Sequence, residues 1–242
     1  MTRSPSAAAW SLDRRRATCL LDGLPSTVEL DRPQAGIEVR LPGAAGVESL
    51  LGLSVDASWA CVDAWSRGAD LTAVYETDAA RLRATAMWRA APPWLAAGAA
   101  PGIWCREVVV SAQTSLLEAV PHIAVVADMA AGSVTAATLR AGRFELAPRA
   151  DCSPHGFFVT GPGERSILFL VHPLDARHVE AQVGGDRVRI TARIFPAPVE
   201  KGVLMRSRVV AAIGPAAGGM PAGSWAATVA AAFAASPPVL TT

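Results

Sequence analysis

The stretch that decides the fold runs from Trp59 to Glu76 and reads WACVDAWSRGADLTAVYE. Successive side chains of a β-strand point to opposite faces, so residues two positions apart share a face. Up to Arg67, one face carries the large and charged side chains, whereas the other carries only Ala, Val and Ser. A second alternating run follows Gly68, and the stretch therefore predicts a β-hairpin.

A two-residue turn at Arg67-Gly68 would fix the register of this hairpin. The expected pairs are Trp65 with Asp70, Asp63 with Thr72, Cys61 with Val74, and Trp59 with Glu76. One face would then combine two indoles with carboxylates and an arginine.

Such a face is typical of a carbohydrate platform, because indole rings stack on C–H groups while carboxylates accept hydrogen bonds from hydroxyls. In this interpretation two residues stack on the ligand, Trp59 and Trp65. Four take its hydroxyls, namely Asp63, Arg67, Asp70 and Glu76. The alternative is structural: the same side chains form a ladder that covers its own sheet, with Arg67 stacked or paired locally.

Length and composition exclude several classes of protein. The chain has 242 residues, 51% of them hydrophobic, which allows one large domain or two small ones. A formal net charge of +1 argues against nucleic acid as a partner. No apolar run is long enough to cross a membrane, and the N-terminus lacks the apolar core of a signal peptide, so we expect a cytoplasmic protein with free thiols.

Three regions are expected: a loose arm over 1–16, a sandwich domain over 17–213, and a linker with a helix over 214–242. The segment 166–172 is apolar throughout its middle and predicts a strand buried on both faces. The segment 123–128 fits either a helix or a buried strand, and Gly184-Gly185-Asp186 predicts a hairpin turn. The other expected strands are 18–21, 27–30, 36–41, 47–55, 81–89, 103–114, 134–139, 143–147, 178–183, 187–195 and 201–213, with a helix over 225–235.

About fourteen strands with one helix and no internal repeat predict an all-β protein, a large two-sheet antiparallel β-sandwich with a short C-terminal helix. The hairpin at 63–76 and the run PVEKGVLMRSRV at 198–209 resemble the large sandwiches of the galactose-mutarotase (supersandwich) type. The resemblance covers the architecture of most of the chain. It implies a concave sheet that holds carbohydrate, with a histidine and a carboxylate as acid and base. That catalytic pattern does not map onto this sequence residue by residue, so no activity is carried over.

Residues that could carry chemistry are few. The cysteines form no C-x-x-C pair and the histidines form no H-x-H or H-E-x-x-H pair, so we expect neither a metal site nor a cofactor. Cys152 and His155 are close in sequence, but adjacency does not create the geometry that activates a thiolate. The catalytic candidates are His172, His178, Asp63 and Asp70. In the expected register Asp63 and Asp70 are diagonal neighbours about 7–8 Å apart, a spacing that would suit an inverting glycosidase.

The leading hypothesis is a cytoplasmic protein that binds carbohydrate or polyol without catalysis. One alternative is a carbohydrate-active enzyme, an epimerase or a glycoside-active protein, that uses a histidine with one of the acids. The other is a structural module that assembles into a homo-oligomer through the aromatic face, since Trp and Arg are favoured at interfaces. Neither a nucleic-acid nor a membrane partner is expected.

Overall fold

The structure is a computed structural model of the whole chain. It describes residues 9–21, 24–43, 46–55, 59–77, 81–90, 92–95, 102–140, 143–147, 154–161, 164–176, 178–195, 197–216 and 224–237.

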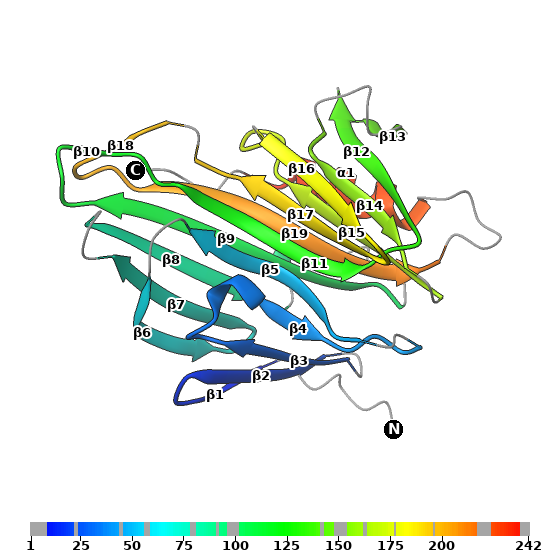
Figure 1. Cartoon of the computed structure of the whole chain (residues 1–242), viewed down its shortest axis with the longest axis horizontal. Coiled ribbons are helices and arrows are strands. Elements are labelled where there is room, and N and C mark those ends of the chain that lie inside the picture. Colours follow the sequence, from blue (N-terminus) through cyan, green and yellow to red (C-terminus); the bar gives the residue numbers. More distant parts are fainter. Residues whose placement is uncertain are drawn as a thin grey trace.

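Two large antiparallel sheets face each other, as the sequence predicts (Figure 1). Sheet A has eight strands in the order β1 (Trp10–Asp13), β2 (Arg16–Leu21), β3 (Leu24–Glu29), β4 (Ile37–Val39), β5 (Glu48–Val55), β11 (Ile123–Ala130), β17 (Arg187–Arg193) and β16 (His178–Gly184). Sheet B has nine, in the order β13 (Arg143–Ala147), β12 (Ser133–Arg140), β14 (Gly156–Thr160), β15 (Arg165–Val171), β19 (Met205–Pro215), β9 (Trp104–Thr114), β8 (Leu82–Arg89), β7 (Asp70–Thr77) and β6 (Ala60–Arg67). A separate pair joins β10 (Glu118–Ala119) to β18 (Val199–Glu200).

The main core lies between the sheets and follows from the alternation of each strand. In β8, for example, Leu82, Ala84, Ala86 and Trp88 are buried, whereas the alternate residues, Arg83 and Arg89 among them, are on the outer face. The Trp88 indole is fully buried, and its N–H donates to the carbonyl of Leu51 in sheet A at 2.9 Å. Because a buried indole nitrogen needs an acceptor, this bond ties the two sheets together at one point.

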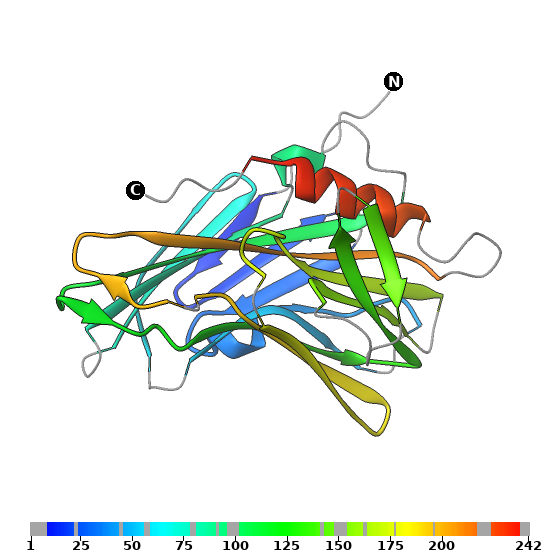
Figure 2. The same ribbon diagram turned by 90° about the horizontal axis from the view of Figure 1, so that it is seen from above.

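A second, smaller core covers part of the outer face of sheet B. Strand β15 is apolar on both faces, as predicted, so Leu168 and Leu170 point away from the main core. The helix α1 (Ser224–Ala235) covers them with Trp225 and Phe233, together with the short 3₁₀ turn η2 (Pro93–Leu95). Figure 2 shows α1 along one outer side of the sandwich, with the β16–β17 hairpin on the other.

The sequence-based strand assignments hold along most of the chain, with three differences. The ambiguous segment 123–128 is strand β11, in the middle of sheet A. Strand β14 and the two-residue strands β10 and β18 were not predicted. The expected arm over 1–16 is wrong from residue 10 onward, because Trp10 is buried in β1 and Arg16 begins β2.

Strand β1 is anchored by one residue, Trp10, through both its side chain and its backbone amide. The Trp10 ring packs into the main core, and the Trp10 amide donates to the Gly68 carbonyl of sheet B at 3.0 Å. None of the described helices is long and apolar enough to span a membrane.

Candidate functional site

The predicted hairpin is present as β6 and β7, and it forms one edge of sheet B. Its register differs from the predicted one by two residues: Arg67 pairs with Asp70, and Trp65 pairs with Thr72. The loop is therefore Gly68-Ala69. Gly68 has a φ of 57°, a left-handed conformation that suits glycine, whereas the predicted turn would require it of Arg67.

A β-bulge at Val62 separates the two tryptophans that were expected to act together. The pairing shifts between Cys61 and Asp63, so that Val62 has no partner and every residue before it changes face. Cys61 is consequently buried, and Trp59 packs against the main core. The prediction that Trp59 shares a face with Trp65 is therefore wrong.

The other part of the predicted platform does lie on one face. Asp63, Trp65 and Arg67 project together from the outer side of β6, with Trp65 46% exposed. Asp63 and Arg67 are exposed as well, and neither forms an ion pair with any residue that the structure describes. The result is an accessible indole between two charges of opposite sign that no described residue neutralises.

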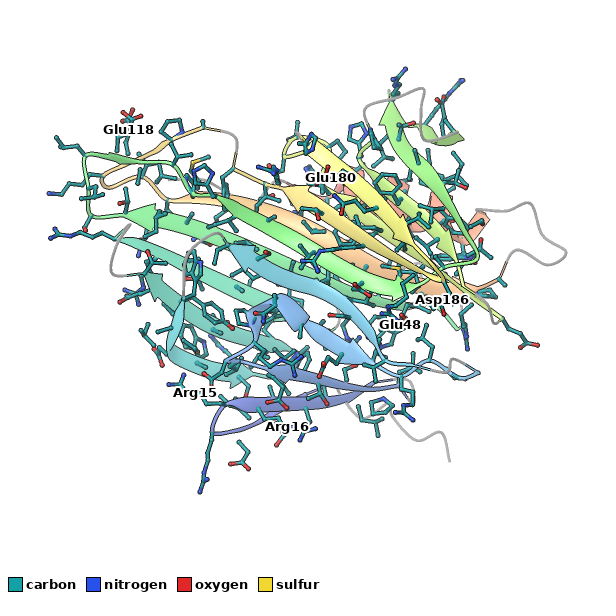
Figure 3. All side chains as sticks on the ribbon, viewed as in Figure 1. Arg15, Arg16, Glu48, Glu118, Glu180 and Asp186 are labelled. Atoms are coloured by element: carbon teal, nitrogen blue, oxygen red, sulfur yellow. The ribbon has the colours of Figure 1, made fainter. Side chains whose placement is uncertain are left out.

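The edge that carries this face is tied to sheet A. Arg15, at the β1–β2 turn, donates from Nη1 to the Cys61 carbonyl at 2.7 Å. Figure 3 shows Arg15 at the end of the β1–β2 hairpin, next to β6. The amide of Trp10 binds the other end of β6 at Gly68. Two separated hydrogen bonds therefore hold an edge strand whose outer side chains remain exposed.

A polar hollow of about 450 Å³ opens at the ends of β7, β8 and β9. On the outer face it includes Glu76, Arg83 and Gln113, which occupy one row across the three strands. Glu76 and Arg83 form an ion pair at 3.5 Å. Glu76 is four residues along β7 from Thr72, the partner of Trp65, so the Cα atoms of Glu76 and Trp65 are about 14 Å apart. The rest of the lining comprises Thr77, Arg81, Leu82, Thr114 and Ser115.

Sequence reasoning missed Arg83 and Gln113 as members of this surface. The alternation within residues 81–89 and 103–114 indicates an outward-facing Arg83, but only the order of the strands brings it next to Glu76.

Asp70 belongs to a line of charges across four neighbouring strands. Its carboxylate is 3.8 Å from Arg89, which is 3.3 Å from Glu107, and Glu107 is in turn 3.7 Å from Arg208. Glu107 is fully buried and Arg208 nearly so. Buried charges of this kind are retained only when they are paired. Asp70 lies at the exposed end of the line, where Arg89 is its structural ion-pair partner.

The observed register also separates the two carboxylates that were expected to work as a pair. Asp63 is opposite Val74, four residues along β7 from Asp70, so their Cα atoms are about 14 Å apart. The predicted diagonal contact at about 7–8 Å is therefore wrong, and the glycosidase spacing disappears with it.

The two candidate histidines lie far from the hairpin. His172 directly follows β15 and is buried beside β19. Because β15 is four strands from β7 in sheet B, His172 lies about 19 Å away laterally. Its ring meets Phe233 of α1 edge-on at 5.3 Å, and its Nδ1 accepts a hydrogen bond from the Leu174 amide. Burial, together with the nearby Arg208 guanidinium, lowers its pKa. These contacts are those of a structural histidine.

His178 lies on sheet A, at the start of β16, where it is 3.5 Å from Glu180. The structure thus brings neither histidine to Asp63 or Asp70. Among the described residues no three His, Cys, Asp or Glu side chains gather as metal ligands. Burial raises the pKa of the Cys19, Cys61 and Cys105 thiols, which disfavours their thiolates, while Cys152 lies outside the described residues.

Fold and surface together define an all-β sandwich with an exposed polar and aromatic edge. No protein-family model matches the chain, and no curated protein matches it in sequence. Among solved structures, it is similar to the GH36 α-galactosidase AgaA from Geobacillus stearothermophilus, with 13% identity and a TM-score of 0.39, over 88% of this chain and 30% of that one. A structure of a variant of that enzyme in complex with 1-deoxygalactonojirimycin gives 10% identity and a TM-score of 0.36, over 85% of this chain and 40% of that one. The chain thus spans less than half of either structure, and similarity at this level assigns no family.

Proposed function

We propose that this protein binds a carbohydrate or a related polyol on the outer face of β6 and β7, without catalysing a reaction there. The observation that carries the proposal is the exposed Trp65 indole between Asp63 and Arg67, two charged side chains that have no ion-pair partner among the described residues.

The chemistry of this triplet fits a sugar ring. An indole face packs against the C–H groups of a pyranose, and Trp65 lies on an edge strand where a ligand can reach it. Asp63 can accept two or more hydrogen bonds from hydroxyls, and the Arg67 guanidinium can donate several. Stacking supplies the apolar contact, and the two charges fix the orientation of the hydroxyls.

The polar hollow supports a ligand longer than one ring. Glu76, Arg83 and Gln113 add planar acceptors and donors on the same outer face, beginning with Glu76, whose Cα atom is about 14 Å from that of Trp65. Between them the row contains Asp63, the buried Val74 and the half-buried Thr85, none of which is an aromatic or long side chain. An oligosaccharide that runs along β6 and β7 would contact both regions.

Binding is favoured over catalysis because the acid and base candidates are dispersed. Asp63 and Asp70 are about 14 Å apart, and His172 and His178 lie elsewhere in the fold. General acid–base chemistry requires both groups within hydrogen-bond reach of the reacting atoms.

Isothermal titration of the protein with neutral mono- and trisaccharides of the gluco, galacto and manno series, at millimolar concentration, tests the proposal. We expect at least one series to bind, trisaccharides more tightly than monosaccharides. Trp65→Ala should weaken binding about tenfold or more, because stacking is lost, and Trp65→Phe should retain most of it.

Trp59→Phe is the matched control, since Trp59 belongs to the same hairpin but packs toward the core. It should bind like the wild type. The proposal fails if no saccharide in the panel binds, or if Trp65→Ala binds as well as the wild type does.

The alternative of self-assembly also has an observation in its favour. Val62 and Trp65 are 48% and 46% exposed on an edge strand, and such strands can pair with a second copy. Light scattering separates the two ideas: a dimer that Trp65→Ala converts into a monomer would assign this face to an interface.

A further inference from the structure

We propose that the outer face of sheet A carries a second binding site, which takes a small organic anion: a carboxylate or phosphate ester with an apolar part. The site is a hollow of about 350 Å³ at the ends of β11, β16 and β17. It lies on the sheet opposite the one that carries Trp65.

The polar residues that line this hollow can all donate hydrogen bonds. Ser54, Ala124, Arg193 and His178 form one row across β5, β11, β17 and β16. Thr191 comes from the next row, and His122 from the segment just before β11. None of the described residues that line the hollow is an aspartate or a glutamate.

Arg193 supplies the charge. Its side chain is exposed, and it forms no ion pair with any described residue. The acid nearest to it along the sheet is Glu180, which is 3.5 Å from His178. Glu180 is opposite Thr191 and therefore shares the face of Arg193, and Figure 3 shows it on the β16–β17 hairpin.

A comparison along β17 shows why the charge at this end is available. Arg187 faces the same side, but its Nε donates to Asp128 at 2.6 Å and its Nη2 is 3.8 Å from Glu48. Six residues further on, Arg193 has only the small Ala124 as its neighbour in β11. One end of the strand is therefore neutralised within the protein, and the other presents a planar guanidinium that suits the paired oxygens of a carboxylate or phosphate.

The rest of the lining is apolar and comprises Val120, Pro121, Ile123 and Phe195. Val120 is 48% exposed, whereas Ile123 and Phe195 belong to the main core and back the hollow from within. Ala124 lies between Ser54 and Arg193 in the row, and its small side chain leaves room that a larger one would occupy. A ligand that places its anionic group on Arg193 and an apolar group against Val120 would satisfy both kinds of lining, which is the usual composition of a small-molecule pocket.

Four probes distinguish the components of the site: phenyl phosphate, benzoate, inorganic phosphate and benzyl alcohol. Titration calorimetry should show that phenyl phosphate or benzoate binds, and that inorganic phosphate and benzyl alcohol bind at least tenfold more weakly. The stronger of the two aromatic anions identifies whether the head group is a phosphate ester or a carboxylate.

Two variants test the assignment to this hollow. Arg193→Gln should weaken binding of the aromatic anion tenfold or more, because a charge-assisted contact is lost. Ala124→Leu should block binding without a change of charge. Arg189→Gln is the matched control, since Arg189 is on the same face of β17 and also has no described ion pair, but lies outside the hollow.

The inference is overturned if neither aromatic anion binds, if benzyl alcohol binds as tightly, or if Arg193→Gln and Arg189→Gln weaken binding equally. The last result would indicate a diffuse electrostatic effect. Thermal melting of each variant shows that it is folded, and Trp65→Ala should leave anion binding unchanged, which separates this test from the test of the sugar surface.

Discussion

Trp59 and Trp65 have the same side chain in different environments, because one unpaired residue, Val62, lies between them. A single bulge therefore changes a predicted two-indole platform into one exposed indole and one core residue. The alternation of the sequence identifies the strand, but it contains no sign of the extra residue.

Another single-residue effect concerns pH. Burial against Phe233 and the neighbouring Arg208 lower the pKa of His172 in the folded state, whereas in the unfolded chain a histidine titrates near 6.5. As the pH falls through that value, the unfolded state takes up a proton that the folded state resists, so the free energy of unfolding decreases.

We therefore expect His172→Gln to lose less stability than the wild type between pH 7.5 and pH 5. Urea denaturation at the two pH values measures this difference. Equal losses in the two proteins would contradict the assignment of a lowered pKa to His172.

At the scale of elements, Gly68 fixes the register of the β6–β7 hairpin. Its φ of 57° is unfavourable for residues with a Cβ atom, and a Cβ at this position would contact nothing within 4 Å. Gly68→Ala should therefore destabilise the protein by about 1–2 kcal/mol through backbone strain alone. Chemical denaturation measures the change.

Ser66→Ala is the control for this prediction. Ser66 belongs to the same hairpin and is exposed, and a surface substitution with ordinary backbone geometry should change stability by less than about 0.5 kcal/mol. Equal effects of the two substitutions would indicate that the turn does not depend on Gly68.

At the scale of the whole molecule, the two sheets present different surfaces. Helix α1 covers one part of the outer face of sheet B and leaves the β6–β8 part open, while sheet A presents the hollow around Arg193. The two proposed sites lie on different sheets with the main core between them and share no described lining residue.

Sites that are well separated and have no common contacts are expected to act independently. Saturation with the best saccharide should therefore leave the Kd for the aromatic anion within about twofold, as measured by calorimetry. A larger change would reveal energetic coupling through the core.

The sequence by itself determined the class of fold and most strand positions, because side-chain alternation is a local property. The two-faced burial of residues 166–172, the hairpin over 59–76 and the C-terminal helix over 225–235 could all be recognised in this way. Tertiary structure alone decided the bulge at Val62, the burial of Trp10 in β1, and the placement of His172 far from the hairpin. These features depend on contacts between residues distant in sequence, and no local pattern specifies which strands become neighbours.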